Sequence, residues 1–160
     1  MSGGTLARED ARLDDPAVGA LTAASISEID ARYGGDPGSG SPPRPEDFLP
    51  PDGLFLVARL DGQAAGCGGF SRFDSITAEL RRMYVVPEAR GLGVGKALLA
   101  WLLEAAREAG YGRIRLETGN RQEEALHLYK AAGFKCIPCW GPYAADPKSR
   151  CFELALEAEH

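Results

Sequence analysis

The chain has 160 residues, a formal net charge of −5 and 44% apolar residues. This length and apolar content predict a single domain over residues 1–160 with one hydrophobic core. The negative charge argues against a nucleic-acid-binding protein, because such a surface needs a basic face. It is compatible with an amine-bearing substrate, although most acidic proteins are simply soluble.

The sequence contains no recognisable targeting or membrane-spanning segment. No stretch approaches the roughly 18 consecutive apolar residues of a membrane-spanning helix. The N-terminal sequence MSGGTLARED lacks the basic and apolar regions of a secretory signal. We therefore expect a cytoplasmic protein without a membrane partner.

Cysteine usage agrees with a cytoplasmic location. The four cysteines are too sparse for a disulfide scaffold and fit a reduced cytosol. Cys136 and Cys139 form a C-x-x-C pair, but neither a second pair nor a nearby histidine completes a zinc site. We expect buried thiols and no metal, with metal or redox use of this pair as the alternative.

The first part of the chain predicts a short strand at Thr5–Arg8 and then a helix. Asp15 followed by Pro16 is typical of a helix start, and apolar residues continue at helical spacing until two glycines end the pattern. Residues 34–50 hold four glycines and five prolines, which predicts a long flexible loop. Such a loop serves either as a substrate-binding lid or as a surface insertion.

The middle of the chain predicts a hairpin, a third strand and an amphipathic helix. The apolar segments 54–60 and 63–70 flank Asp61-Gly62, a dipeptide preferred in two-residue hairpin turns. Segment 78–86 is predicted to be a strand that the next proline stops. Apolar residues from 94 to 105 then follow the spacing of one helix face.

The last part of the chain predicts a strand at 113–118, a second helix over 125–132 and two final strands, KCIPCW and RCFELAL. Asn120, with Glu123 three residues later, resembles a capping box for the second helix. The alternation of strands and helices, without internal repeats, predicts a mixed α/β architecture.

The stretch RGLGVG, residues 90–95, places glycines at every second position where the amphipathic helix begins. Glycine lets a ligand approach bare backbone, and the unpaired N–H groups of a first helical turn favour an anion. Arg90 would add a charge-assisted contact. The stretch therefore predicts a phosphate or pyrophosphate site.

Two familiar phosphate-binding motifs do not fit this turn. In a dinucleotide fingerprint the third glycine would fall on Lys96 or Leu98. In a Walker A loop a Ser or Thr must follow the lysine to bind Mg²⁺, and Ala97 stands there. The missing magnesium ligand favours a pyrophosphate that is held and not cleaved.

RGLGVG resembles the R/Q-x-x-G-x-G/A signature of the GNAT N-acetyltransferase superfamily, where this turn holds the pyrophosphate of acetyl-CoA. MYVVPEARGLGVGKALL is similar to the family's fourth strand, bulge and third helix, and QEEALHLYKAAGF is similar to its next helix. The resemblance covers residues 54–156 and is faint before them. It implies a mainly antiparallel central sheet flanked by helices, with acetyl-CoA as co-substrate and no metal.

The resemblance also implies a set of cofactor-binding residues. The backbone of Met83 and Val85 would hold the pantetheine, and the Val85 N–H would face the oxyanion of the reaction. Gln122 replaces the family's usual Asn, which keeps the amide but lengthens the side chain that would contact the pantetheine. The full set is Met83, Tyr84, Val85, Arg90, Gly91, Leu92, Gly93, Val94, Gly95, Lys96 and Gln122.

For catalysis, the resemblance implies direct attack of an amine on the acetyl thioester in a ternary complex. Tyr129 would protonate the departing CoA thiolate, although its helical spacing also fits a core aromatic. Glu79 would accept the proton of the amine, directly or through water, and Glu117 is the alternative base. An acyl-enzyme on Cys67 has no activating residue nearby in the sequence.

The acceptor is expected to be a small-molecule amine or a protein amine, and the chain is expected to be a monomer or a homodimer. Trp140, Tyr143 and the 34–50 loop would border the acceptor pocket. Two other functions stay open. One is an acyl-CoA sensor without turnover, against which the intact Tyr129 argues. The other is a phosphotransferase, against which the missing Ser or Thr after Lys96 argues.

Overall fold

The computed structural model describes residues 4–34 and 43–156. The elements in this part of the chain are β1 (Leu6–Asp10), α1 (Pro16–Arg32), the 3-10 helix η1 (Pro45–Phe48), β2 (Leu54–Leu60), β3 (Gln63–Arg72), β4 (Thr77–Val85), the 3-10 helix η2 (Pro87–Ala89), α2 (Val94–Glu108), β5 (Arg113–Gly119), α3 (Glu123–Ala131), β6 (Lys135–Ile137), the 3-10 helix η3 (Gly141–Tyr143) and β7 (Ser149–Ala155).

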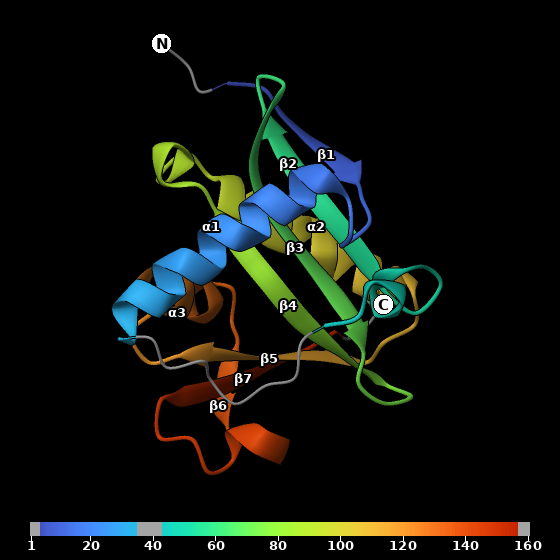
Figure 1. The fold of residues 1–160 in the computed structure, drawn as a ribbon. Coiled ribbons are helices and arrows are strands. Elements are labelled where there is room, and N and C mark those ends of the chain that lie inside the picture. Colours follow the sequence, from blue (N-terminus) through green and yellow to red (C-terminus); the bar gives the residue numbers. More distant parts are fainter. Residues whose placement is uncertain (1–3, 35–42, 157–160) are drawn as a thin grey trace.

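The described residues form one sheet of seven strands in the order β1-β2-β3-β4-β5-β7-β6. Among these strands only β4 and β5 are neighbours that run parallel, which confirms the mixed α/β fold with a mainly antiparallel sheet. Helix α1 crosses one face of the sheet, and α2 lies behind it (Figure 1). None of the helices described is long and apolar enough to cross a membrane.

Two apolar clusters fill the space between the sheet and its helices. The larger cluster joins α2 and α3 to the sheet and contains Leu98, Leu102 and Ile114, each 0% exposed. The smaller cluster lies under α1 and contains Val18 and Phe55, also 0% exposed. Because each cluster packs against a different face of the same strands, α1 and α2 are held on opposite sides of the sheet.

The loop predicted over residues 34–50 is only partly a loop. Residues 35–42 lie outside the described residues, so the lid stays a prediction for them. Residues Pro45–Phe48 form η1, where the Phe48 ring is 1% exposed and its centroid lies 5.9 Å from that of Phe55. This part of the segment is docked in the core by an aromatic side chain, and the prediction of a flexible loop is wrong there.

Strands β4 and β5 separate early, and this opening positions the site. They pair only over Thr77–Glu79 on β4, and Figure 1 shows the two strands diverging beyond that point. Farther along β4, Arg82 has a φ of 63° and the register with β3 shifts between Cys67 and Gly69. This β-bulge bends the end of β4. There, Tyr84 and Val85 still pair with β3, but the edge that faces the opening has no β5 partner among the described residues.

The starts of the two later helices differ in how well local sequence predicted them. Gly93 is the N-cap of α2, and its φ of 86° lies in the left-handed region that favours glycine. Helix α3 begins after Gln122 without a side-chain capping bond, so the capping box of Asn120 and Glu123 is wrong. The Asn120 N–H instead donates to the Lys148 carbonyl at 2.8 Å, which ties this residue to the segment before β7.

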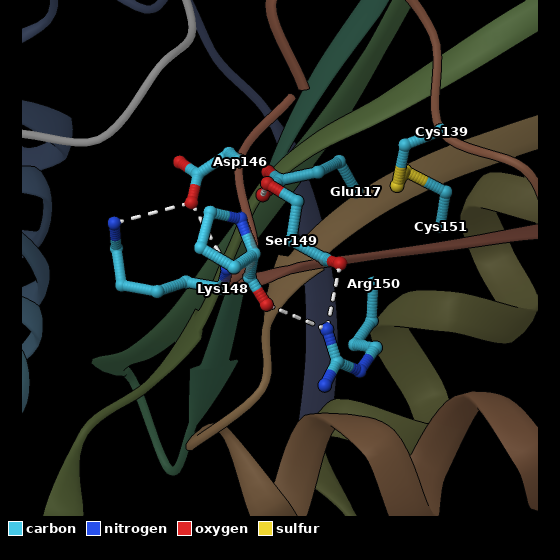
Figure 2. Close-up of a disulfide and its surroundings, with 8 residues drawn as sticks. Glu117, Cys139, Asp146, Lys148, Ser149, Arg150 and Cys151 are labelled. Atoms are coloured by element: carbon cyan, nitrogen blue, oxygen red, sulfur yellow. Dashed lines mark hydrogen bonds and ion pairs between the residues drawn. A yellow bond between two sulfur atoms is a disulfide. The ribbon is translucent and has the colours of Figure 1, made fainter. Parts of the chain in front are cut away.

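The cysteines also differ from the expectation. Cys139 and Cys151 form a disulfide (Figure 2). Cys136 is exposed and Cys67 is buried. The prediction of reduced thiols is therefore wrong for Cys139 and Cys151, and the prediction of burial is wrong for Cys136. The pattern C-x-x-C does not reveal the partner of Cys139. Cys151 lies opposite Ile137 in the antiparallel pairing of β6 with β7, and Cys139 follows Ile137 by two residues.

Candidate active site

A cavity of about 260 Å³ opens at the end of β4, between the first turn of α2, the start of α3 and the last turns of α1. Its lining combines apolar side chains with charged groups from all three helices. The sequence-predicted residues that line it are Met83, Tyr84, Val85, Arg90, Gly91, Gly93, Val94, Gly95, Lys96, Gln122 and Tyr129.

Two predicted site residues lie outside this lining. Leu92 sits in the glycine turn, but its side chain is 53% exposed at the surface. Glu79 lies on β4 before the bulge and does not line the cavity. Six lining residues were missed, of which Ala89 belongs to η2 and Glu124, Ala125 and Leu128 belong to α3. The other two are Glu28 and Arg32 of α1. Their i,i+4 spacing was a visible signal of a helical ion pair, although it did not indicate which side of the helix would face a site.

The glycine turn presents open backbone at the start of α2. Gly91 and Gly93 have φ values of 80° and 86°, and neither would bring an added Cβ within 4 Å of another atom. Gly95 differs, since an added Cβ would lie 3.5 Å from Val85 Cγ2 and 3.6 Å from Leu128 Cδ2. Both of these side chains line the cavity, so glycine at this position keeps the cavity open between β4 and α3.

The Arg90 side chain lines the cavity in an ion pair. Its Nη2 donates to both carboxylate oxygens of Glu28, at 2.7 and 2.9 Å, and its Nε donates to the Val85 carbonyl at 3.1 Å. The hydrogen bond from Arg90 holds the pKa of Glu28 below its usual range, against the opposing effect of burial. The structure thus adds a carboxylate to a site for which the sequence predicted cationic and neutral groups.

Tyr129 of α3 is 5% exposed and lines the cavity beside Phe134, with ring centroids 5.5 Å apart. Burial raises the pKa of its hydroxyl, and no hydrogen bond or charge among the described residues contributes to that shift. The hydroxyl therefore stays protonated at neutral pH. Such a group can donate a proton, as the resemblance requires of this residue.

Two carboxylates lie together on the α1 face of the sheet, beyond the cavity. The register places Glu79 opposite Arg115, and Glu117 follows Arg115 by two residues, so both glutamates point to the same face. Burial raises the pKa of each, and the charge of Glu79 raises the pKa of Glu117 further. Both carboxylates also raise the pKa of the Tyr143 hydroxyl. Ser149 Oγ donates to Glu117 Oε2 at 2.7 Å (Figure 2).

Aromatic side chains border this carboxylate pair. The Arg115 guanidinium carbon lies 4.6 Å from the ring centroids of both Phe73 and Trp140. The Trp140 and Tyr143 rings form an edge contact at 5.7 Å. The structure therefore brings the two predicted aromatic residues together beside the candidate bases, although they come from a loop some 60 residues beyond β4.

Cys67 is not arranged as a nucleophile. It is 1% exposed, its Sγ lies 3.5 Å from the Arg82 carbonyl, and burial raises the pKa of its thiol to about 12. A thiol in this state is protonated at neutral pH, and the thiolate is the reactive form. Among residues 4–34 and 43–156, no group of three or more His, Cys, Asp and Glu could hold a metal ion.

Comparisons with known proteins show which family this chain resembles. The model of the acetyltransferase (GNAT) family matches residues 23–134. An IAA acetyltransferase of Azospirillum brasilense is 40% identical over 107 residues, which are 66% of this chain and 70% of that protein.

Solved structures show the same fold. A Klebsiella pneumoniae protein assigned to the acyl-CoA N-acyltransferases superposes with a TM-score of 0.81 and 28% identity, covering 96% of this chain and 99% of that one. A GNAT family acetyltransferase of Elizabethkingia anophelis, crystallised with acetyl-CoA bound, has a TM-score of 0.65 and 17% identity, with 94% and 97% coverage.

Proposed function

Because the chain belongs to the GNAT family and is an acyl-CoA-dependent acetyltransferase, we propose that it transfers the acetyl group of acetyl-CoA to a primary amine by direct attack in a ternary complex. One observation carries this proposal. A single cavity joins the glycine turn, the bent end of β4 and Tyr129, which are the three parts that the reaction requires.

In this proposal the backbone at the start of α2 binds the pyrophosphate. The first-turn N–H groups have no helical partners, and the positive φ of Gly91 and Gly93 exposes them without side chains. The end of β4 holds the pantetheine in the opening toward β5, along the strand edge that β5 leaves unpaired beyond Glu79 among the described residues. The Val85 N–H then stabilises the negative charge that develops on the carbonyl oxygen.

Proton transfer needs one acid and one base. Tyr129 donates a proton to the CoA thiolate as the carbon–sulfur bond breaks, because its hydroxyl is neutral and borders the cavity. Glu79 accepts the proton of the amine, directly or through water. Its raised pKa makes it a stronger base than an exposed glutamate, and the neighbouring Glu117 is the competing candidate.

The residues around the base favour a compact amine as acceptor. Two carboxylates attract an ammonium group, and the rings of Trp140 and Tyr143 provide flat apolar contact beside them. A protein N-terminus or lysine presents the same functional group on a larger carrier. Acceptors of both sizes therefore belong in the experiment that tests this function.

The experiment has two stages. Calorimetric titration with acetyl-CoA and, separately, ATP identifies the cofactor, and we expect heat of binding with acetyl-CoA alone. Release of free thiol from acetyl-CoA is then followed with spermidine, phenethylamine, lysine and a peptide with a free N-terminus. Amine-dependent release supports the enzyme. Binding without release under all four amines would indicate a sensor, and binding of ATP alone would indicate a phosphotransferase.

A further inference from the structure

The last turns of α1 bridge the opening between β4 and β5. The two strands pair only as far as Glu79, and the cavity lies where they have separated. Figure 1 shows α1 crossing the sheet obliquely, with its C-terminal end beside α3. Side chains of this end make polar contacts with both walls of the opening, and the contacts differ from one wall to the other.

The contact with the β4 wall is made by Glu28. Its carboxylate binds Arg90 Nη2 through both oxygens, and Arg90 Nε binds the carbonyl of Val85, the last residue of β4. Glu28 and Arg90 are 25% and 26% exposed, so the pair is mostly shielded from water. One carboxylate thus joins α1, β4 and the beginning of the glycine turn.

The contact with the β5–α3 wall is made by the next turn of α1. Arg32 Nη2 binds the same Glu28 carboxylate at 2.7 Å, and its Nη1 donates to Gln122 Oε1 at 2.7 Å. The Arg121 N–H donates to the Tyr33 hydroxyl at 2.8 Å. A Cβ on Gly119 would collide with that hydroxyl, so the close approach requires glycine at the end of β5.

We propose that Glu28 and Arg90 are positioning residues that set the width of the opening, and that Arg90 acts through this bridge and not as the main ligand of the pyrophosphate. The proposal rests on the acetyl transfer proposed above and deepens it. It departs from the role that the family resemblance implies for Arg90. The reason is that Nη2 and Nε of Arg90 already have protein partners.

The charge balance supports this assignment. A phosphate that took Arg90 from Glu28 would leave this mostly buried carboxylate with Arg32 as its one remaining cationic partner among the described residues, and a buried charge that loses a partner is destabilised. The hydrogen bond from Arg90 lowers the pKa of Glu28, which keeps the carboxylate ionised and the bridge intact at neutral pH. The backbone N–H groups of the glycine turn remain available for the pyrophosphate.

The test compares two acetyl donors, acetyl-CoA and S-acetylpantetheine, which lacks the pyrophosphate and the nucleotide. Initial rates with the best amine of the panel give kcat/KM for wild type, Glu28→Gln, Arg90→Ala and the double variant. We expect each single variant to lower kcat/KM about 10-fold with both donors, because misplacing a wall affects the shared acetyl-pantetheine part. The double variant should be no worse than either single variant, since both remove one interaction.

Asp30→Asn is the matched control, since it removes the same charge from an exposed position on the same helix. It should leave kcat/KM with acetyl-CoA and with S-acetylpantetheine within about 2-fold of wild type, because surface substitutions usually have small effects. A loss in Arg90→Ala confined to acetyl-CoA would make Arg90 a phosphate ligand and overturn the proposal. A gain in acetyl-CoA rate in Glu28→Gln would overturn it too, since Glu28 would then only compete with the phosphate.

A second measurement does not depend on catalysis. Amide hydrogen exchange of the free protein should be faster over residues 119–122 in both Glu28→Gln and Arg90→Ala, and unchanged in Asp30→Asn. If exchange is unchanged in Glu28→Gln and Arg90→Ala, then Glu28 and Arg90 do not set the width of the opening, even if the protein transfers acetyl groups. Faster exchange in a protein that releases no thiol with any amine would instead support the bridge and contradict the proposed function.

Discussion

Ser149 Oγ lies 2.7 Å from Oε2 of Glu117 and donates a hydrogen bond to it, whereas no described residue makes such a bond to Glu79. The bond stabilises the ionised form of Glu117 and partly opposes the effect of burial on its pKa. This difference separates two carboxylates that are otherwise alike in burial and in the face of the sheet they occupy. It also provides a way to tell which of them is the base.

The first prediction concerns that base. Burial raises the pKa of Glu79, and a base must be deprotonated to act, so activity should fall as pH drops through this raised value. Glu79→Gln should lower kcat about 100-fold and remove this acid limb. Ser149→Ala raises the pKa of Glu117, because it removes a bond to the carboxylate, and it should leave the limb in place. A limb displaced to higher pH in Ser149→Ala would identify Glu117 as the base.

The second prediction concerns Tyr129 as the general acid. Tyr129→Phe keeps the ring packing against Phe134 and removes only the hydroxyl, which no described residue binds. We expect kcat to fall by about 10- to 1000-fold, while acetyl-CoA affinity and the thermal unfolding midpoint stay close to wild type. Steady-state kinetics, calorimetry and thermal unfolding test the three parts. An unchanged kcat with lower stability would make Tyr129 a core residue only.

The third prediction uses Gly95 to separate folding from cofactor binding. Gly95→Ala should fit the helix, because its Cβ would make ordinary contacts at 3.5 and 3.6 Å, and it should raise stability by about 0.5–1 kcal/mol. It should weaken acetyl-CoA binding only a few-fold, since both contacts are with cavity-lining side chains but the family signature admits alanine at this position. Gly19→Ala in α1 is the control: no atom lies within 4 Å of the added Cβ, so stability should rise without loss of affinity. Equal affinities for the two variants would contradict a ligand at Gly95.

The fourth prediction concerns the disulfide. Cys139→Ser should lower the free energy of unfolding by about 2–3 kcal/mol under non-reducing conditions, because the cross-link closes a loop between residues 12 apart. Cys136→Ser changes an exposed, free thiol and should have no such effect. Urea unfolding with and without a dithiol reductant tests both variants. A wild-type protein whose stability does not respond to the reductant would show that the thiols are not linked.

Local sequence determined the features that depend on neighbouring residues. The hairpin of β2 and β3 forms at Asp61 and Gly62, whose φ values of 52° and 83° suit the predicted two-residue turn. Helix α2 follows its apolar spacing, and Gly93 starts it because few other residues adopt its backbone conformation. The glycine turn and Tyr129, about 35 residues apart, also had their own sequence patterns, and they meet in one cavity as the family resemblance implied.

Tertiary structure alone decided the features whose partners are distant in the chain. Glu28 meets Arg90 across 62 residues and Cys139 meets Cys151 through strand pairing, and no local pattern specifies either contact. The Phe48 ring packs in the core although its neighbours are rich in proline, because burying the ring stabilises the fold more than the loop tendency of its neighbours opposes it. The sequence by itself therefore determined the fold class and the glycine turn. The ion pair of Arg90 with Glu28 and the Cys139–Cys151 cross-link arose only when packing brought separate segments together.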